Sequence, residues 1–322
     1  MNNISRRNFV LSATAASAAF GLNGPLEFIG SAQAQAYSNV KLIDKGFYKF
    51  KVGDVEVTQI YDGIWNRAFE DNFVKNAQPD QVKAALKAGG LADNIIPIPF
   101  TVTVVKMKGK YVMFDSGTGG QVQSTAGLMS AKNMKAAGID PAKIETIIVT
   151  HFHPDHIFGL MAKDTNAQTY PNATIYLPKP ELAWWTGSVP QPAQGISNRV
   201  KATFPSWKNV QQIDGDKEVV GGVRSIATPG HTPGHTSYLV GSGKQQLLVL
   251  GDITNIPLLF VKNPGWQAVF DADGALAETN RRKIMDRAIA DKLIVAGYHY
   301  SMPGAGTFKR DGNGYVFVPV KV

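Results

Sequence analysis

The sequence predicts an α/β (α+β) protein in which packed β-sheets are flanked by helices. Three observations support this fold class. Short β-branched and aromatic runs recur along the chain between turn signals such as Gly53-Asp54. Few segments have clear helical character, and Leu276–Ala290 is the most distinct of them. Strands and helices do not alternate strictly, which favours packed sheets with helices on their outer faces.

The first half of the chain contains two expected hairpins, each a pair of apolar runs around a turn signal. Their strands are Phe47–Val52, Val55–Asp62, Phe100–Lys106 and Tyr111–Asp115. A helix is expected over Leu128–Ala137, ended by Gly138. Asp140-Pro141 has the pattern of an N-cap followed by proline and predicts one short turn. The β-branched run Ile144–Thr150 predicts a buried strand.

The second half of the chain also contains mainly short expected strands and few helices. Strands are expected at Thr174–Leu177, Val223–Ala227, Thr236–Val240, Gln246–Leu250, Leu293–Ala296 and Tyr315–Val320. A helix signal at Lys179-Pro180-Glu181 is followed by a long expected loop between Trp184 and Lys208. Arg281-Arg282-Lys283 is expected on the solvated face of the helix Leu276–Ala290. No repeat or linker divides the chain, so residues 37–322 are expected to form one domain.

Composition narrows the function classes. The 322 residues contain no cysteine, which excludes a Cys nucleophile, a disulfide framework and a Cys-based metal site. The net charge is +8, from 33 basic and 25 acidic residues, and the basic residues are scattered. We therefore expect no nucleic-acid partner. Only six histidines occur in the whole chain, so their placement is informative.

The N-terminus has the pattern of an export signal. Arg6-Arg7 precedes an apolar, Ala- and Ser-rich run without a charge until Glu27. Small-residue cleavage sites lie at residues 32–34 and 34–36. We predict that residues 1–36 are a twin-arginine signal peptide and that the protein is periplasmic or secreted. The run is less hydrophobic than the ~20 strongly apolar residues of a membrane span, so no stable membrane anchor is expected.

The chemistry-bearing residues are concentrated at the ends of expected strands. The strand Ile144–Thr150 leads into His151-Phe152-His153-Pro154-Asp155-His156, which places four candidate ligands within six positions. Imidazole and carboxylate are ligands that Zn²⁺ takes in proteins. The remaining candidates follow three other strands: His231 and His235 share one Gly/Pro loop, and Asp252 and His299 each follow a further strand. A charged residue such as Asp252 directly after a buried strand is costly unless it faces a metal ion or a paired cation. The pattern predicts a metal site.

These residues resemble the metallo-β-lactamase superfamily from about residue 45 to the end of the chain. The shared pattern is His-x-His-x-Asp-His, a distant His, Gly-Asp after a strand and a late His. The closer similarity is to the methyl parathion hydrolase and lactonase branch. It rests on Gly46-Phe-Tyr-Lys-Phe50, Phe114-Asp-Ser-Gly117, His231-Thr-Pro-Gly-His-Thr236 and Tyr298-His-Tyr-Ser-Met-Pro-Gly304. The resemblance implies an αββα sandwich with the metals at the sheet edges between its two halves.

The resemblance also implies a role for each residue. His151, His153 and His231 would hold one divalent ion, and Asp155, His156 and His299 the other. Asp252 would bridge the two ions, which are expected to be Zn²⁺, with Mn, Fe or Co as alternatives. Asp115 matches a position that braces the metal loops and could orient a ligand imidazole. His235 has no ligand role in the pattern and is interpreted as a residue that packs the loop.

The expected reaction is hydrolysis by a hydroxide shared between two divalent ions about 3.5–4 Å apart. Lactones or aryl esters are the expected substrates, with phosphotriesters as a further class, and Asp155 together with Asp252 is assigned to catalysis. Asp155 is the candidate proton shuttle. The alternative is an organophosphate hydrolase of the methyl parathion type. Gln121 stands near a position where that enzyme has an aromatic residue, which favours lactones or aryl esters instead. The sequence does not decide whether the protein is a monomer or a homodimer.

Other readings fit less well. A true β-lactamase of this fold generally lacks an equivalent of Asp252. A glyoxalase II-like thioesterase adds a helical glutathione domain, whereas only 23 residues follow His299. A diiron redox protein usually has a carboxylate in place of His153, and a processing nuclease needs further nucleic-acid domains. A non-catalytic metal-binding protein would bind metal tightly without turnover. The expected substrate pocket is aromatic and includes Phe152, Trp184 and Trp185.

Overall fold

The computed structural model describes residues 39–241 and 243–322. The predicted signal peptide therefore lies outside the described residues. Within the described part, no helix combines the length and the apolar character needed to cross a membrane.

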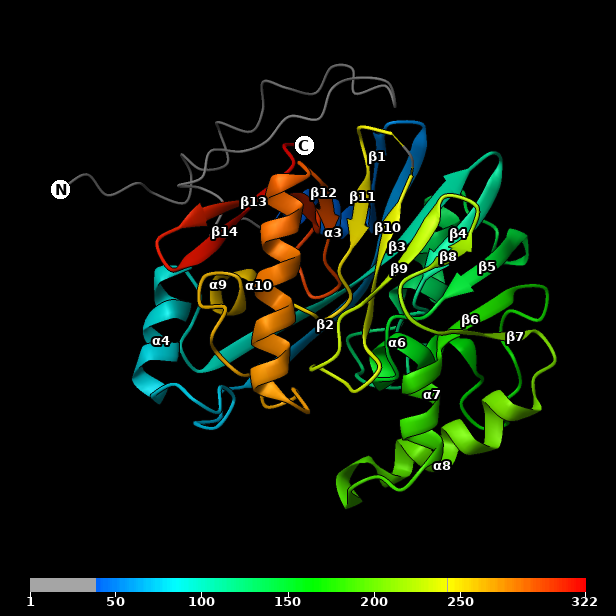
Figure 1. The fold of residues 1–322 in the computed structure, drawn as a ribbon, viewed down its shortest axis with the longest axis horizontal. Coiled ribbons are helices and arrows are strands. Elements are labelled where there is room, and N and C mark those ends of the chain that lie inside the picture. The colour runs from blue at the N-terminus through cyan, green and yellow to red at the C-terminus, as the bar shows by residue number, and fades with distance from the viewer. Residues whose placement is uncertain (1–38, 242) are drawn as a thin grey trace.

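The fold is built on two seven-stranded mixed sheets (Figure 1). The first has the order β1-β2-β3-β4-β5-β6-β7, antiparallel up to β4 and parallel from β4 to β7. Its strands are Phe47–Val52, Val55–Ala68, Ile95–Met107, Lys110–Phe114, Ile144–Ile148, Thr174–Pro178 and Val210–Ile213. Hydrophobic β-branched runs produce these strands because both faces of the sheet are covered.

The second sheet has the order β14-β13-β12-β11-β10-β9-β8, in which only β11 and β12 are parallel. Its strands are Glu218–Val220, Val223–Ala227, Thr236–Val240, Leu247–Val249, Ile294–Ala296, Ala305–Asp311 and Gly314–Pro319, from β8 to β14. The α-helices are α3 Val40–Lys45, α4 Pro79–Ala88, α5 Met134–Ala136, α6 Pro154–Ile157, α7 Lys179–Thr186, α8 Gln194–Thr203, α9 Pro257–Phe260 and α10 Gly274–Ala290.

Three buried clusters show how the layers stack. Phe114 from the first sheet and Tyr238 from the second belong to the cluster between the sheets, with ring centroids 5.6 Å apart. A larger cluster covers the other face of the first sheet. A third joins the second sheet to α10 through Ile284 and Met285. The order helix, sheet, sheet, helix confirms the predicted sandwich of two sheets flanked by helices.

The structure also corrects several expectations. β2 and β3 extend beyond the predicted Val55–Asp62 and Phe100–Lys106, because residues 63–68 pair with residues 95–100 across a bulge. The expected helix Leu128–Ala137 is a π-helical turn at Met129–Asn133 followed by the short α5. The stretch between Trp184 and Lys208 is not a long loop: Trp184 lies in α7, and α8 follows. Gly195 and polar residues lower the helix propensity of α8, and packing of Val200 overrides it.

Candidate metal centre

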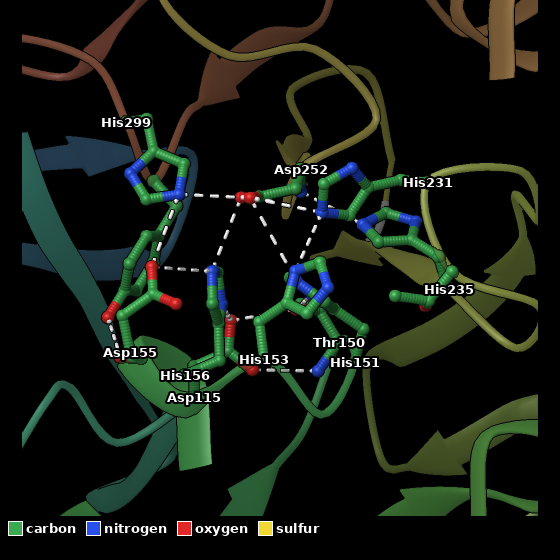
Figure 2. A network of polar contacts seen from close by, with 12 residues as sticks. Asp115, Thr150, His151, His153, Asp155, His156, His231, His235, Asp252 and His299 are labelled. Carbon is green, nitrogen blue, oxygen red and sulfur yellow. Dashed lines mark hydrogen bonds and ion pairs between the residues drawn. The ribbon is translucent and has the colours of Figure 1, made fainter. Parts of the chain in front are cut away.

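The candidate ligands converge because they follow neighbouring strands. The motif His151–His156 comes after β5 and continues into α6, and His231 lies in the loop between β9 and β10. Asp252 follows β11, and His299 follows β12. Figure 2 shows these side chains turned toward one centre, with Asp252 in the middle. Strand ends from both sheets therefore build the site.

The first cluster consists of His151, His153, His231 and Asp252, one atom of each lying within 4.8 Å of the others. His153 Nδ1 lies 3.0 Å from the Nε2 atoms of both His151 and His231. His231 Nε2 lies 3.4 Å from Asp252 Oδ2. Three imidazole nitrogens and one carboxylate oxygen in this arrangement form the donor set of a zinc site.

The second cluster consists of Asp155, His156 and His299. Asp155 Oδ2 lies 3.3 Å from His299 Nε2 and 3.5 Å from His156 Nε2. Asp252 connects the two clusters, because its carboxylate also lies 2.9 Å from His299 Nε2 and 3.4 Å from His156 Nε2. The seven residues therefore have the grouping that the sequence resemblance implies; their roles as ligands stay a prediction.

Two atoms at the centre test whether a metal fits. His156 Nε2 and Asp252 Oδ1 are buried and, among the described residues, have no hydrogen-bond partner. A buried polar atom without a hydrogen-bond partner costs free energy, so two of them side by side in a native protein need an explanation. A divalent cation between them would satisfy both, and imidazole with carboxylate is a donor set that zinc accepts. The residues fit a metal site.

Electrostatics at the site favour a cation. Burial, and then the neighbouring imidazoles, lower the pKa of His151 well below its ordinary value. Burial also acts to lower the pKa of His156, but the carboxylates of Asp252 and Asp155 outweigh it and raise this pKa well above its usual range. Against the effect of burial, His299 and His156 hold the pKa of Asp252 well below its ordinary value. Carboxylates that stabilise a proton here also stabilise a divalent ion.

Further hydrogen bonds orient the ligand rings. Asp115 Oδ2 lies 2.8 Å from His156 Nδ1, while the backbone N–H and the hydroxyl of Thr150 also donate to this carboxylate. This is the bracing position that the sequence suggested for Asp115. His299 Nδ1 lies 2.9 Å from the carbonyl oxygen of Pro99. These contacts leave Nε2 of both rings facing the centre.

One bracing pair was missed from the sequence. His231 Nδ1 lies 2.9 Å from Asp271 Oδ1, and the guanidinium of Arg281 donates to Asp271 Oδ2 at 3.2 Å. Arg281 is only 2% exposed, so its predicted place on a solvated face is wrong. The signal was present in α10, because Arg281 has the helical spacing of the buried residues Ala277 and Ile284.

His235 belongs to neither cluster. Its Nε2 accepts a hydrogen bond from the backbone N–H of Asp252 at 2.9 Å, so Nδ1 carries the proton and donates to Thr228 Oγ1 at 2.8 Å. Burial, with the nearby His231, lowers its pKa to about 3. A Cβ at Gly251 would lie 2.6 Å from His235 Nε2, so glycine is needed there. His235 thus fixes the backbone that presents Asp252.

A pocket of about 410 Å³ opens onto both clusters. It is mostly apolar, and its aromatic lining residues are Trp65, Phe100, Trp184, Trp185 and Phe270. Among the residues that the structure describes, no lysine or arginine lines it. A pocket of this kind suits a neutral, apolar ligand.

Two pocket expectations need correction. Trp184 and Trp185 line the pocket as expected, but Phe152 does not. Phe152 is fully buried in the core, 5.1 Å from Phe204 between ring centroids, because alternate residues of the motif point to opposite sides. Gln121 is not among the lining residues either: its amide donates to the carbonyl oxygens of Phe158 and Met161, and the adjacent Val122 lines the pocket.

Comparison with known proteins gives consistent matches. The family model described as "Metallo-beta-lactamase superfamily" matches residues 98–297. An N-acyl homoserine lactonase from Bacillus sp is 31% identical over 150 residues, which are 47% of this chain and 54% of that protein. The chain thus spans about half the length of the curated relatives it matches.

Two solved structures are similar over most of the chain. AidC, a dizinc quorum-quenching lactonase in complex with a homoserine product, has a TM-score of 0.80 and 26% identity. The match covers 86% of this chain and 98% of AidC. The hydrolase AbOPH of the β-lactamase superfamily has a TM-score of 0.78 and 25% identity, with the same coverage of both chains.

Proposed function

Because this chain belongs to the metallo-β-lactamase superfamily, we propose that it is a two-zinc hydrolase that cleaves lactones or aryl esters. One observation carries the proposal: two buried ligand clusters share Asp252 at the inner end of an apolar pocket. Buried ionisable groups in a pocket are typical of catalytic sites. The similarity to lactonases supports the choice of substrate.

Each cluster has its own part in the proposed mechanism. His151, His153 and His231 would hold one zinc ion, Asp155, His156 and His299 the other, and Asp252 both. When bound, the two ions supply Lewis acidity and lower the pKa of water to about 7. Asp252 is fixed for this task, because its backbone N–H is bound by His235 and its carboxylate faces four imidazoles.

Asp155 is the residue placed to carry a proton. Its side chain is 15% exposed and it lines the pocket, whereas the neighbouring His156 is fully buried. The hydroxyl of Tyr298 donates to the carbonyl oxygen of Asp155 at 2.5 Å and fixes its backbone. When a lactone ring opens, the attacking water loses one proton and the leaving oxygen gains one; the Asp155 carboxylate is placed to take the first proton and pass it to the leaving oxygen.

The pocket selects for neutral substrates. A β-lactam or a glutathione thioester carries carboxylates, which need a cationic partner when they leave water. Among the described residues no lysine or arginine lines the pocket, so the proposed zinc ions would be the only cations there, and a carboxylate would compete with the scissile group for them. A lactone or aryl ester is neutral and would bury its apolar part against Trp65, Trp185 and Phe270. A neutral phosphotriester meets the same requirement, so organophosphate hydrolysis is the second candidate function.

The test compares kcat/KM of the zinc-loaded protein on four substrates: an N-acyl homoserine lactone, an aryl acetate, methyl parathion and a penicillin. We expect hydrolysis of the lactone and the aryl ester to exceed that of the penicillin by at least about a hundredfold, since the lost carboxylate partner alone is worth several kcal/mol. A preference for methyl parathion would select the second candidate. Preference for penicillin would refute the proposed pocket chemistry.

We also propose that the protein is exported after cleavage near residue 36 and works as the single domain 37–322. Arg6-Arg7 supports this proposal. Replacing both arginines by lysine should leave the protein in the cytoplasm with its signal attached, which cell fractionation and mass measurement would detect.

A further inference from the structure

We propose that Glu181 is a positioning residue, whose buried carboxylate joins the two loops of the first cluster to the wall of the substrate pocket. Glu181 lies in the first turn of α7 and is fully buried. For its catalytic readout the inference rests on the proposed function; its metal-binding readout does not.

Four donors occupy this carboxylate. Oε1 accepts from the backbone N–H of Phe152 at 3.0 Å and from the indole N–H of Trp185 at 2.7 Å. Oε2 accepts from the hydroxyl of Thr232 and from the backbone N–H of Gly234, both at 2.8 Å. Among the described residues no lysine or arginine forms an ion pair with Glu181. Burial raises the pKa of the Glu181 carboxyl, and these four donors act against that effect and offset part of the cost of burying the charge.

The donors come from three functional segments. Phe152 lies between His151 and His153, so the hydrogen bond from its N–H to Glu181 holds the loop that carries these two histidines, the first metal loop. Thr232 and Gly234 follow His231 in the second metal loop. Each of the three histidines of the first cluster is therefore next in sequence to a residue that Glu181 binds. Glu181 binds backbone and hydroxyl groups of these neighbours and not the imidazole rings themselves.

The third segment is the pocket wall. Trp185 follows Glu181 by one helical turn, lines the pocket, and has its ring centroid 6.4 Å from that of His153. A Cβ at Gly234 would lie 2.1 Å from the Glu181 backbone nitrogen, so the second metal loop packs directly on α7. Movement of the wall must therefore move both metal loops. Contact of substrate with Trp185 and retention of the first-cluster ion are coupled, and such coupling is reciprocal.

Glu181→Gln tests the proposal in the full chain. The amide NH₂ would face donors where the carboxylate accepted, so at least one loop loses its anchor. We expect the dissociation constant of one of the two zinc ions to rise about 10–100-fold, with the other changed little. Competition with a chromophoric chelator measures both constants, and the absorption spectrum of Co²⁺ in the protein detects the altered ligand geometry.

Asp62→Asn is the matched control. Asp62 is also a buried carboxylate, 1% exposed, and accepts three hydrogen bonds from Thr118 and Met129, which hold no candidate ligand. Its replacement should lower Tm but leave both zinc dissociation constants within twofold. If Glu181→Gln behaves in the same way, Glu181 is only structural and the proposal is wrong.

Two further variants separate the links. Trp185→Phe removes the indole donor and shortens the ring that lines the pocket, so KM for an aryl ester should rise; because three other donors still hold Glu181, zinc affinity should fall less than in Glu181→Gln. Thr232→Val removes one donor to Oε2 and should weaken zinc binding several-fold, which keeps the test available if Glu181→Gln does not fold. Unchanged zinc affinity in Thr232→Val would then overturn the proposal. Failure of the wild type to hydrolyse any ester would refute the proposed function and leave the zinc measurements valid.

Discussion

The two ligand clusters share Asp252 but are supported in different ways. In the second cluster, His156 is oriented by Asp115, a carboxylate whose other partners belong to Thr150, next to the metal motif. In the first, His231 is oriented by Asp271, which is paired with the buried Arg281 of α10. Glu181 of α7 adds a further anchor to the first cluster. Thr150 Oγ1 also lies 2.9 Å from His151 Nδ1 in the first cluster. The first cluster therefore draws two further supports from the distant helices α7 and α10, whereas the supports of the second lie beside strand ends.

The shared residue should give the largest effect. Asp252→Asn removes the charge that faces both clusters, so we expect loss of at least one zinc ion and a fall in kcat/KM beyond the ~10–100-fold typical of residues that only orient a ligand. Elemental analysis after gel filtration and a lactone assay measure the two quantities. Retention of two ions with near-normal activity would remove Asp252 from the bridging position.

Removal of both ions should destabilise the fold. At a thousandfold excess over its Kd, each ion contributes about 4 kcal/mol of stability. At roughly 2–4 °C per kcal/mol, chelation of both should lower Tm by about 16–32 °C. Differential scanning calorimetry with and without chelator measures this shift. A Tm that does not respond to chelation would show that the clusters need no cation.

The bracing carboxylates should distinguish the clusters. Asp271→Asn leaves the Arg281 guanidinium buried without its anionic partner, which costs about 3 kcal/mol. In the zinc-loaded protein His156 would be a neutral ligand, so Asp115→Asn strands no cation and should cost less stability. Both should weaken zinc binding, and urea unfolding of the two variants compares their free energies of unfolding. Equal destabilisation would contradict the difference drawn between the clusters.

The smallest effect is expected in the pocket wall. Trp184 lines the pocket, and its ring contacts that of Trp185. Trp184→Leu should raise KM for an aryl ester about threefold to tenfold, as expected from the loss of roughly 1 kcal/mol of aromatic contact. Zinc stoichiometry should stay at two. A change in metal content would show that the wall and the clusters are coupled through Trp184 as well.

The same difference explains what the sequence could predict. The residues of the second cluster and their brace Asp115 lie next to strand ends, where a β-branched run followed by His or Asp is visible in the sequence. The long-range supports of the first cluster were not visible in this way. Asp271 is not among the residues that the sequence singles out for the site, and Arg281 is expected on a solvated face, because a buried charge is recognised only once its partner is known.

Helical spacing carried part of the missing information. Arg281 shares a stripe with the apolar residues of α10 that face the core, and Glu181 lies four residues before Trp185 on the buried face of α7. The error at Phe152 has a related cause: the alternation that turns His151 and His153 to the site turns Phe152 into the core. The periodicity of strands and helices in the sequence was enough to predict the candidate ligands. It was not enough to predict the residues of other helices that bind and orient them.

The most direct test titrates Zn²⁺ into the metal-free protein and follows zinc binding and lactone hydrolysis in the same samples. The account predicts two tightly bound equivalents per chain, with hydrolysis rising steeply as the second equivalent binds. Full hydrolysis with one equivalent, or two bound equivalents without hydrolysis of any lactone or aryl ester, would contradict a reaction centre built from both clusters around Asp252.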